Sequence, residues 1–140
     1  MAAPDFYFAI NATFRWVYDN WGEEGLVAYW QALGREHYAD VTERFREGGM
    51  EAVRDYWQDF FAEEPGGDVS VTRDADTVTI DVRVCPAIKH LREHGREIMH
   101  LYCRHCQIVS QAMCEGAGIE VQVKGGGGSC VQTFRRGGCS

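Results

Sequence analysis

The chain has 140 residues, 45% of them hydrophobic, which predicts one domain with its own core. Its formal net charge is -7 and no segment concentrates lysine and arginine, so we expect no nucleic-acid partner. No apolar run is long enough to cross a bilayer, and the first residues do not resemble a signal peptide. We therefore expect no membrane partner and a cytoplasmic location.

The first half of the chain has the apolar period of helices. The first predicted helix ends at Gly22, the second covers about residues 23–46, and the third about residues 50–63. We take His37 as a core histidine. The predicted inward stripes are Phe6, Ile10, Phe14, Val17 and Trp21, then Leu26, Trp30, Leu33, His37, Val41 and Phe45, then Val53, Trp57, Phe60 and Phe61.

The second half alternates between strand-like and helical patterns. Residues 69–71 and 78–84 alternate apolar and polar side chains, which predicts a β-hairpin. A short helical or turn segment at 87–94 and a long helix at about 96–115 follow, and a second hairpin covers residues 119–134. The predicted fold is α+β and forms a single domain over 1–140. Helices in residues 1–64 pack on an antiparallel sheet of two hairpins that flank the long helix in residues 68–135.

The densest group of reactive side chains is Tyr102-Cys103-Arg104-His105-Cys106, which the period places inside the long helix. A thiol beside an imidazole can form a thiolate near neutral pH, so we predict cysteine and histidine catalysis. Adjacent helix positions point about 100° apart, so His105 could serve Cys106 or a cysteine on another element. We expect Cys106 or Cys130 to have a lowered pKa.

Two further clusters surround cysteines. Cys85 ends a strand, with Lys89 and His90 about one helical turn later, and four glycines at 125–128 precede Ser129 and Cys130. The glycines predict a flexible turn. Beside a cysteine, their backbone N–H groups could instead donate hydrogen bonds to a carboxylate or oxyanion. The alternative reading of His90, Arg92 and His94 is a solvated helix surface, which we prefer for His94. The predicted catalytic residues, expected in one pocket, are Cys85, His105, Cys106 and Cys130. The predicted substrate-binding residues are Lys89, His90, Tyr102, Gly127, Gly128 and Ser129.

All six cysteines lie in the second half of the chain. In a reducing cytosol we expect free thiols and no structural disulfide, with Cys114 buried and inert and Cys139 exposed in the tail. We predict no cofactor. The alternative is a zinc or iron site, because Cys103 and Cys106 form a C-x-x-C pair that needs further ligands. Its candidate ligands are Cys85, Cys103, Cys106 and Cys130.

The order of these motifs resembles the L-2-amino-thiazoline-4-carboxylic acid hydrolase family. The resemblance covers about residues 78–135 and rests on Cys85-Pro86, Tyr102-Cys103-Arg104-His105-Cys106, Gly118-Ile119, and Gly126-Gly127-Gly128-Ser129-Cys130 with Phe134. It implies a hydrolase that opens a C–N bond of a small cyclic amidine-like or thiazoline substrate, and the named family product is N-carbamoyl-L-cysteine. The alternatives are a metal-binding sensor or a ligand-binding domain without catalysis. A homo-oligomer is compatible with each of these readings.

Overall fold

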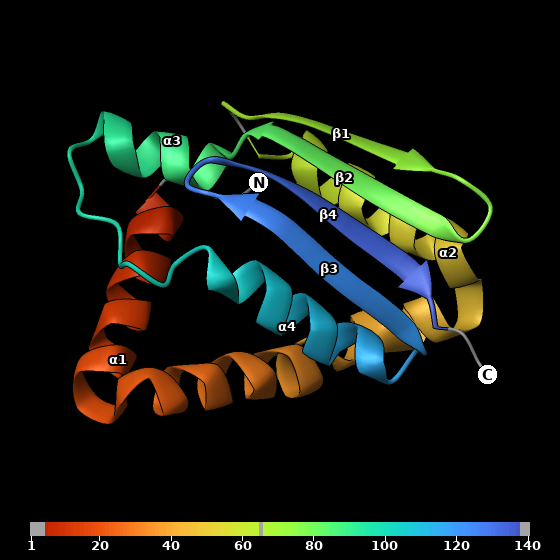
Figure 1. The fold of residues 1–140 in the computed structure, drawn as a ribbon, viewed down its shortest axis with the longest axis horizontal. Coiled ribbons are helices and arrows are strands. Elements are labelled where there is room, and N and C mark those ends of the chain that lie inside the picture. Colours follow the sequence, from red (N-terminus) through yellow and green to blue (C-terminus); the bar gives the residue numbers. More distant parts are fainter. Residues whose placement is uncertain (1–4, 65, 138–140) are drawn as a thin grey trace.

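The computed structural model of this chain describes residues 5–64 and 66–137, and it has the α+β architecture that the sequence predicts. Figure 1 labels its elements in chain order. They are α1 (Asp5–Ala32), the π-helical turn η1 (Leu33–His37), α2 (Ala39–Ala62), β1 (Asp68–Arg73), β2 (Thr77–Val84), α3 (Pro86–Glu93), α4 (Arg104–Glu115), β3 (Ile119–Gly126) and β4 (Ser129–Arg136).

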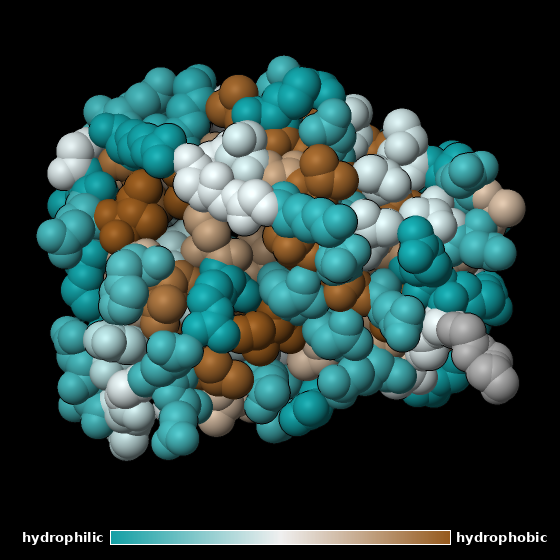
Figure 2. Space-filling view, in the orientation of Figure 1, coloured by the Kyte–Doolittle hydropathy of each residue, from teal (hydrophilic) through white to brown (hydrophobic). Residues whose placement is uncertain are grey.

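The two hairpins join into one four-stranded antiparallel sheet with the order β1-β2-β4-β3. Alternate residues such as Val78, Ile80 and Phe134 are fully buried against the helices. In Figure 1, α2 runs behind β1 and β2, and α4 lies alongside β3. The face shown in Figure 2 is mainly hydrophilic with separate apolar patches, as expected for an antiparallel sheet with one solvated side.

Three breaks divide the N-terminal helices, and the sequence indicates two of them. Gly22 and Gly49 have positive φ angles of 71° and 65°, so the backbone turns sharply inside α1 and α2. The third break is η1, which makes the single helix predicted over residues 23–46 wrong. A Cβ atom on Gly34 would lie 2.5 Å from the carbonyl oxygen of Val109, so η1 packs its backbone directly against α4.

The long helix is shorter than predicted, because α4 begins at Arg104 and not near residue 96. Gly95 ends α3 with a φ of 64°, and residues 96–103 form an irregular connection. The buried side chain of Asn11 fixes this connection. Its Nδ2 donates to the carbonyl of Glu97 at 2.8 Å, and its Oδ1 accepts the N–H of Met99 at 2.9 Å. Tyr102 therefore precedes the helix.

The predicted inward stripes are correct at most positions and wrong at their margins. Phe14, Leu26, Trp30, Phe45 and most of the other stripe residues are buried or partly buried. The large side chains that are exposed instead are Phe6, Trp21 and Phe60. His37 is also exposed, so its assignment to the core is wrong. It lies in η1, where the helical period changes, and its ring contacts Tyr38 at a centroid distance of 4.8 Å.

Within the described part of the chain, no helix is long and apolar enough to cross a membrane.

Candidate functional site

Four cysteines from three elements gather where the sheet meets the N-terminal ends of α3 and α4. We call them the thiol cluster: Cys85, Cys103, Cys106 and Cys130. Cys85 is the N-cap residue of α3, and Cys103 is the N-cap residue of α4. Burial raises the pKa of both Cys85 and Cys130, and the neighbouring thiols Cys106 and Cys103 raise it further. These couplings place the four thiols near one another, while the shared pocket expected for Cys85, His105, Cys106 and Cys130 stays a prediction.

His105 is held in one orientation by the backbone before α4. Its Nδ1–H donates to the carbonyl of Tyr102 at 2.5 Å, so the opposite nitrogen, Nε2, is free to accept a proton. That Nε2 lies 3.8 Å from the Sγ atom of Cys106. The rings of Phe14 and Tyr102 stand 5.1 and 5.0 Å from the imidazole, and this burial lowers the pKa of His105. The pair is thus a neutral imidazole facing a thiol.

Three thiols of this cluster, those of Cys85, Cys106 and Cys130, have a higher pKa than the sequence suggests. Burial raises the pKa of Cys106 to about 11, and raises the pKa of Cys130 as well. Burial also raises the pKa of Cys85 to about 11, although the N–H groups of Ile88 and Ala87 oppose it. The prediction that Cys106 or Cys130 has a lowered pKa is therefore wrong. Burial outweighs the hydrogen bonds that oppose it, which come from the backbone for Cys106 and from the Gln132 side chain for Cys130.

The glycine turn between β3 and β4 lies against a guanidinium. A Cβ atom on Gly128 would be 3.2 Å from Nη1 of Arg92, and one on Gly127 would be 3.9 Å from Nη2. Among the described residues, no carboxylate pairs with Arg92. The predicted cation, Lys89, forms an ion pair with Glu93 at 3.7 Å instead. The turn and Arg92 together could bind an anion.

The other predicted substrate-binding residues occupy different environments. Tyr102 is buried beside the thiol cluster, and burial followed by the nearby thiols raises its pKa. His90 is partly buried, and its ring lies 4.2 Å from that of His94 and 5.0 Å from that of Phe8. Its Nε2 is buried and has no hydrogen-bond partner among the described residues. Ser129 is exposed at the end of the glycine turn.

A tyrosine–carboxylate pair borders the cluster, and no local sequence signal predicts it. The hydroxyl group of Tyr7 donates to the carboxylate of Glu64, 57 residues away in the chain. Burial raises the pKa of Tyr7, hydrogen bonding to Glu64 raises it further, and the nearby thiol of Cys85 contributes as well. This pair brings α1 and the end of α2 to the thiol cluster.

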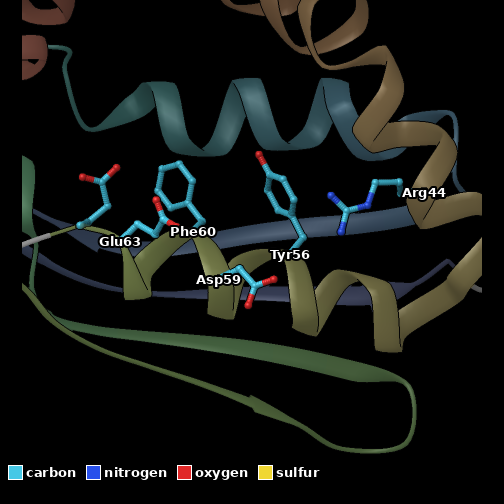
Figure 3. Close-up of a pocket in the computed structure, with 6 residues that line it drawn as sticks. Arg44, Tyr56, Asp59, Phe60 and Glu63 are labelled. Carbon is cyan, nitrogen blue, oxygen red and sulfur yellow. The ribbon is translucent and has the colours of Figure 1, made fainter. Parts of the chain in front are cut away.

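Glu64 also lines a recess of about 380 Å³ on the α2 side of the molecule (Figure 3). Figure 3 shows Tyr56 and Phe60 pointing from α2 toward α4, with Arg44 at one end and Glu63 at the other. The guanidinium of Arg44 stands over the Tyr56 ring, 5.6 Å from its centre. The recess contains none of the predicted catalytic residues. Its link toward the thiol cluster is Glu64, which accepts the hydrogen bond from Tyr7.

The five described cysteines bear on the predictions about disulfides and metal binding. All five are free in this structure, and Cys114 is completely buried. Cys139 lies outside the described residues. Over residues 5–64 and 66–137, no three or more histidine, cysteine, aspartate or glutamate side chains are placed to hold a metal ion. The four cysteines named as candidate zinc ligands thus lie near one another, but they are not arranged to coordinate one metal ion.

No protein-family model and no curated protein sequence matches this chain. The hydrolase resemblance therefore rests on the motifs alone.

Proposed function

We propose that this chain is a cytoplasmic hydrolase for a small cyclic amidine-like or thiazoline substrate, with Cys106 as the nucleophile and His105 as its base. The observation that best supports this proposal is the pair formed by the Cys106 thiol and the His105 imidazole. The bond from Nδ1 to the carbonyl of Tyr102 leaves the lone pair of Nε2 available, 3.8 Å from Sγ. A nucleophile, a base and a group that orients the base are the parts that covalent catalysis needs.

The proposed reaction starts at the ring carbon between sulfur and nitrogen. As Sγ of Cys106 bonds to this carbon, His105 takes the thiol proton and delivers it to the ring atom that leaves. If the ring sulfur leaves, the enzyme carries an isothiourea. Water then adds its oxygen to the same carbon, and N-carbamoyl-L-cysteine and the free thiol are released. If the ring nitrogen leaves, which is the predicted C–N cleavage, the carbamoyl group remains on the substrate sulfur.

A carboxylate on the substrate has a matching partner beside the thiol cluster. The guanidinium of Arg92 lies on the glycine turn at Gly127 and Gly128 and has no carboxylate partner among the described residues. Arginine is suited to carboxylates because its planar N–H groups can bind both oxygens. We therefore assign carboxylate binding to Arg92 and the turn, since Lys89 is paired with Glu93.

The first test uses L-2-amino-thiazoline-4-carboxylate and follows its loss by chromatography, with a thiol reagent to identify the leaving atom. The variants His105→Gln and Cys106→Ala should lower kcat/KM by about 10²-fold or more. His37→Gln and Cys114→Ala are matched controls, because His37 is exposed and Cys114 is packed away from the pair. Turnover that survives both site variants would exclude this mechanism. Saturable binding without turnover would make the chain a ligand-binding module.

The pH dependence provides a second check on the same pair. His105 must be neutral to accept the thiol proton, and its pKa is held below the ordinary value of 6.5 by burial. Activity should therefore persist at pH 6.5 and decline only in more acidic solution. It should rise toward alkaline pH, because the pKa of Cys106 is about 11. A rate maximum near pH 6 would require a different nucleophile.

A further inference from the structure

Cys103 and Cys106 form a C-x-x-C pair at the N-terminal end of α4, where Cys103 is the N-cap residue. Residues three apart on a helix share one face, with Cβ atoms about 5–6 Å apart, so a small adjustment brings two such thiols to disulfide distance. We propose that these two cysteines form a redox-active dithiol that exchanges with small anionic disulfides.

Cys103 is placed to be the attacking thiol. It is partly exposed, and its Sγ accepts the backbone N–H of Gly127 at 3.4 Å. The guanidinium of Arg92 lies against the same glycine turn, and no carboxylate among the described residues pairs with it. This cation, on the turn that contacts Cys103, attracts an anionic reactant toward the thiol. The preferred disulfide is therefore one that carries carboxylate groups.

Cys106 is placed to be the resolving thiol. It lies one helical turn further along α4, partly buried, with Nε2 of His105 3.8 Å from its Sγ. Cys103 attacks the disulfide and expels one thiolate, which leaves a mixed disulfide. Cys106 then attacks the Cys103 sulfur, its proton passes to His105, and the second thiolate departs. In total, the two protein thiols become one disulfide and the reactant disulfide is reduced to two thiols.

The test starts with the fully reduced full-length chain under anaerobic conditions, with oxidised glutathione as the probe and peptide mapping by mass spectrometry. The expected product is a Cys103–Cys106 disulfide. Cys106→Ser should stop at a glutathione adduct on Cys103, and Cys103→Ser should slow oxidation at least about tenfold. Cys114→Ala is the matched control and should react like the unaltered chain. A product that joins Cys103 to Cys85 or Cys130 would overturn the assignment of the pair.

A charge series tests the role of Arg92. Oxidised glutathione is anionic, hydroxyethyl disulfide is neutral, and cystamine is cationic, so their rates with the unaltered chain should fall in that order. Arg92→Gln should slow the anionic probe by about three- to tenfold and leave the neutral probe unchanged. Equal slowing of all three probes would contradict electrostatic recognition, and circular dichroism of the variant shows whether its fold is retained.

Single variants test the disulfide-exchange proposal and the hydrolase proposal separately. Cys103→Ser should lose disulfide exchange and keep thiazoline ring opening, because the hydrolytic mechanism uses the thiol of Cys106 and not that of Cys103. His105→Gln should lose ring opening and still form the Cys103–Cys106 disulfide, although more slowly. Stoichiometric zinc in the reduced chain would overturn the redox proposal, because metal-bound thiolates do not exchange freely.

Discussion

Asn11 positions the segment that leads into the thiol cluster. The side-chain amide of Asn11 forms hydrogen bonds with the backbone of Glu97 and Met99, and these bonds hold the irregular connection after α3 in place. Only 4% of the Asn11 surface is exposed. This one side chain decides where α4 can begin, and so where Tyr102 and Cys103 lie. A buried backbone group whose partner is removed keeps its full desolvation penalty.

Asn11→Ala should therefore destabilise the fold by about 1–3 kcal/mol, since the N–H of Met99 loses its acceptor, whereas the carbonyl of Glu97 keeps the Arg15 side chain as a donor. Urea unfolding at pH 7 measures the change. Thr13→Ala is the control: its hydroxyl bonds only to the carbonyl of Ala9 on the exposed side of the same helix, and its loss should change stability by less than about 0.5 kcal/mol. Equal effects of both variants would show that Asn11 does not organise the connection.

The residues of the site differ in how far the sequence can predict them. Cys85 could be placed at a helix N-terminus, because Pro86 follows it and proline favours the first helical position. Arg92 could not be placed, because its contact with the glycine turn lies about 35 residues away in the chain and leaves no local pattern. The pKa values could not be predicted either, since they depend on burial that only the packed structure defines.

At the scale of elements, α4 closes the edge of the sheet that β3 would otherwise leave open. Oε1 of Gln111 accepts the N–H of Val121 at 3.0 Å. Gln107 donates to the carbonyl of Val121 at 2.8 Å and accepts the N–H of Val123 at 2.7 Å. Side chains from a helix thus take the place of a further strand. Open strand edges invite pairing with other chains, so these contacts protect the β3 edge from such pairing.

Gln107→Ala should destabilise the fold by about 1–2 kcal/mol and increase association at high protein concentration. Urea unfolding and light scattering measure the two effects. The matched control is Gln122→Ala, because Gln122 is an exposed residue of β3, between Val121 and Val123. Unchanged scattering by Gln107→Ala, even with lowered stability, would show that the edge is protected in some other way.

The boundaries of elements follow the sequence where a local rule sets them. Glycines at 22 and 49 mark real kinks, and the strand periods at 78–84 and 119–123 predict β2 and β3. The prediction fails where a distant contact decides, as at η1, where Gly34 meets α4, and before α4, where Asn11 holds the connection. Periodicity gives the type of element, and tertiary hydrogen bonds and close backbone contacts set its ends.

Over the whole molecule, buried thiols and phenols make the fold sensitive to alkali. The pKa is raised by burial to about 11 for Cys85 and Cys106, and to about 12 for Cys114 and Tyr56. Below pH 9 the thiols are protonated in both the folded and the unfolded chain, so their contribution to stability is fully present. As the pH rises from 9 toward these folded-state values, the unfolded chain releases protons that the folded chain keeps. The free energy of unfolding must therefore fall.

Cys114 allows this effect to be measured for a single group, because it is completely buried and burial alone raises its pKa. Between pH 9 and 11, Cys114→Ala should lose stability less steeply than the unaltered chain, by about 1.4 kcal/mol per pH unit. At pH 7 the same variant should be less stable by about 1 kcal/mol, owing to the lost packing. Urea unfolding across this pH range gives both slopes, and Ser110→Ala, a buried residue of the same helix that does not titrate, should run parallel to the unaltered chain. Parallel curves for Cys114→Ala as well would mean that this thiol ionises equally easily in both states.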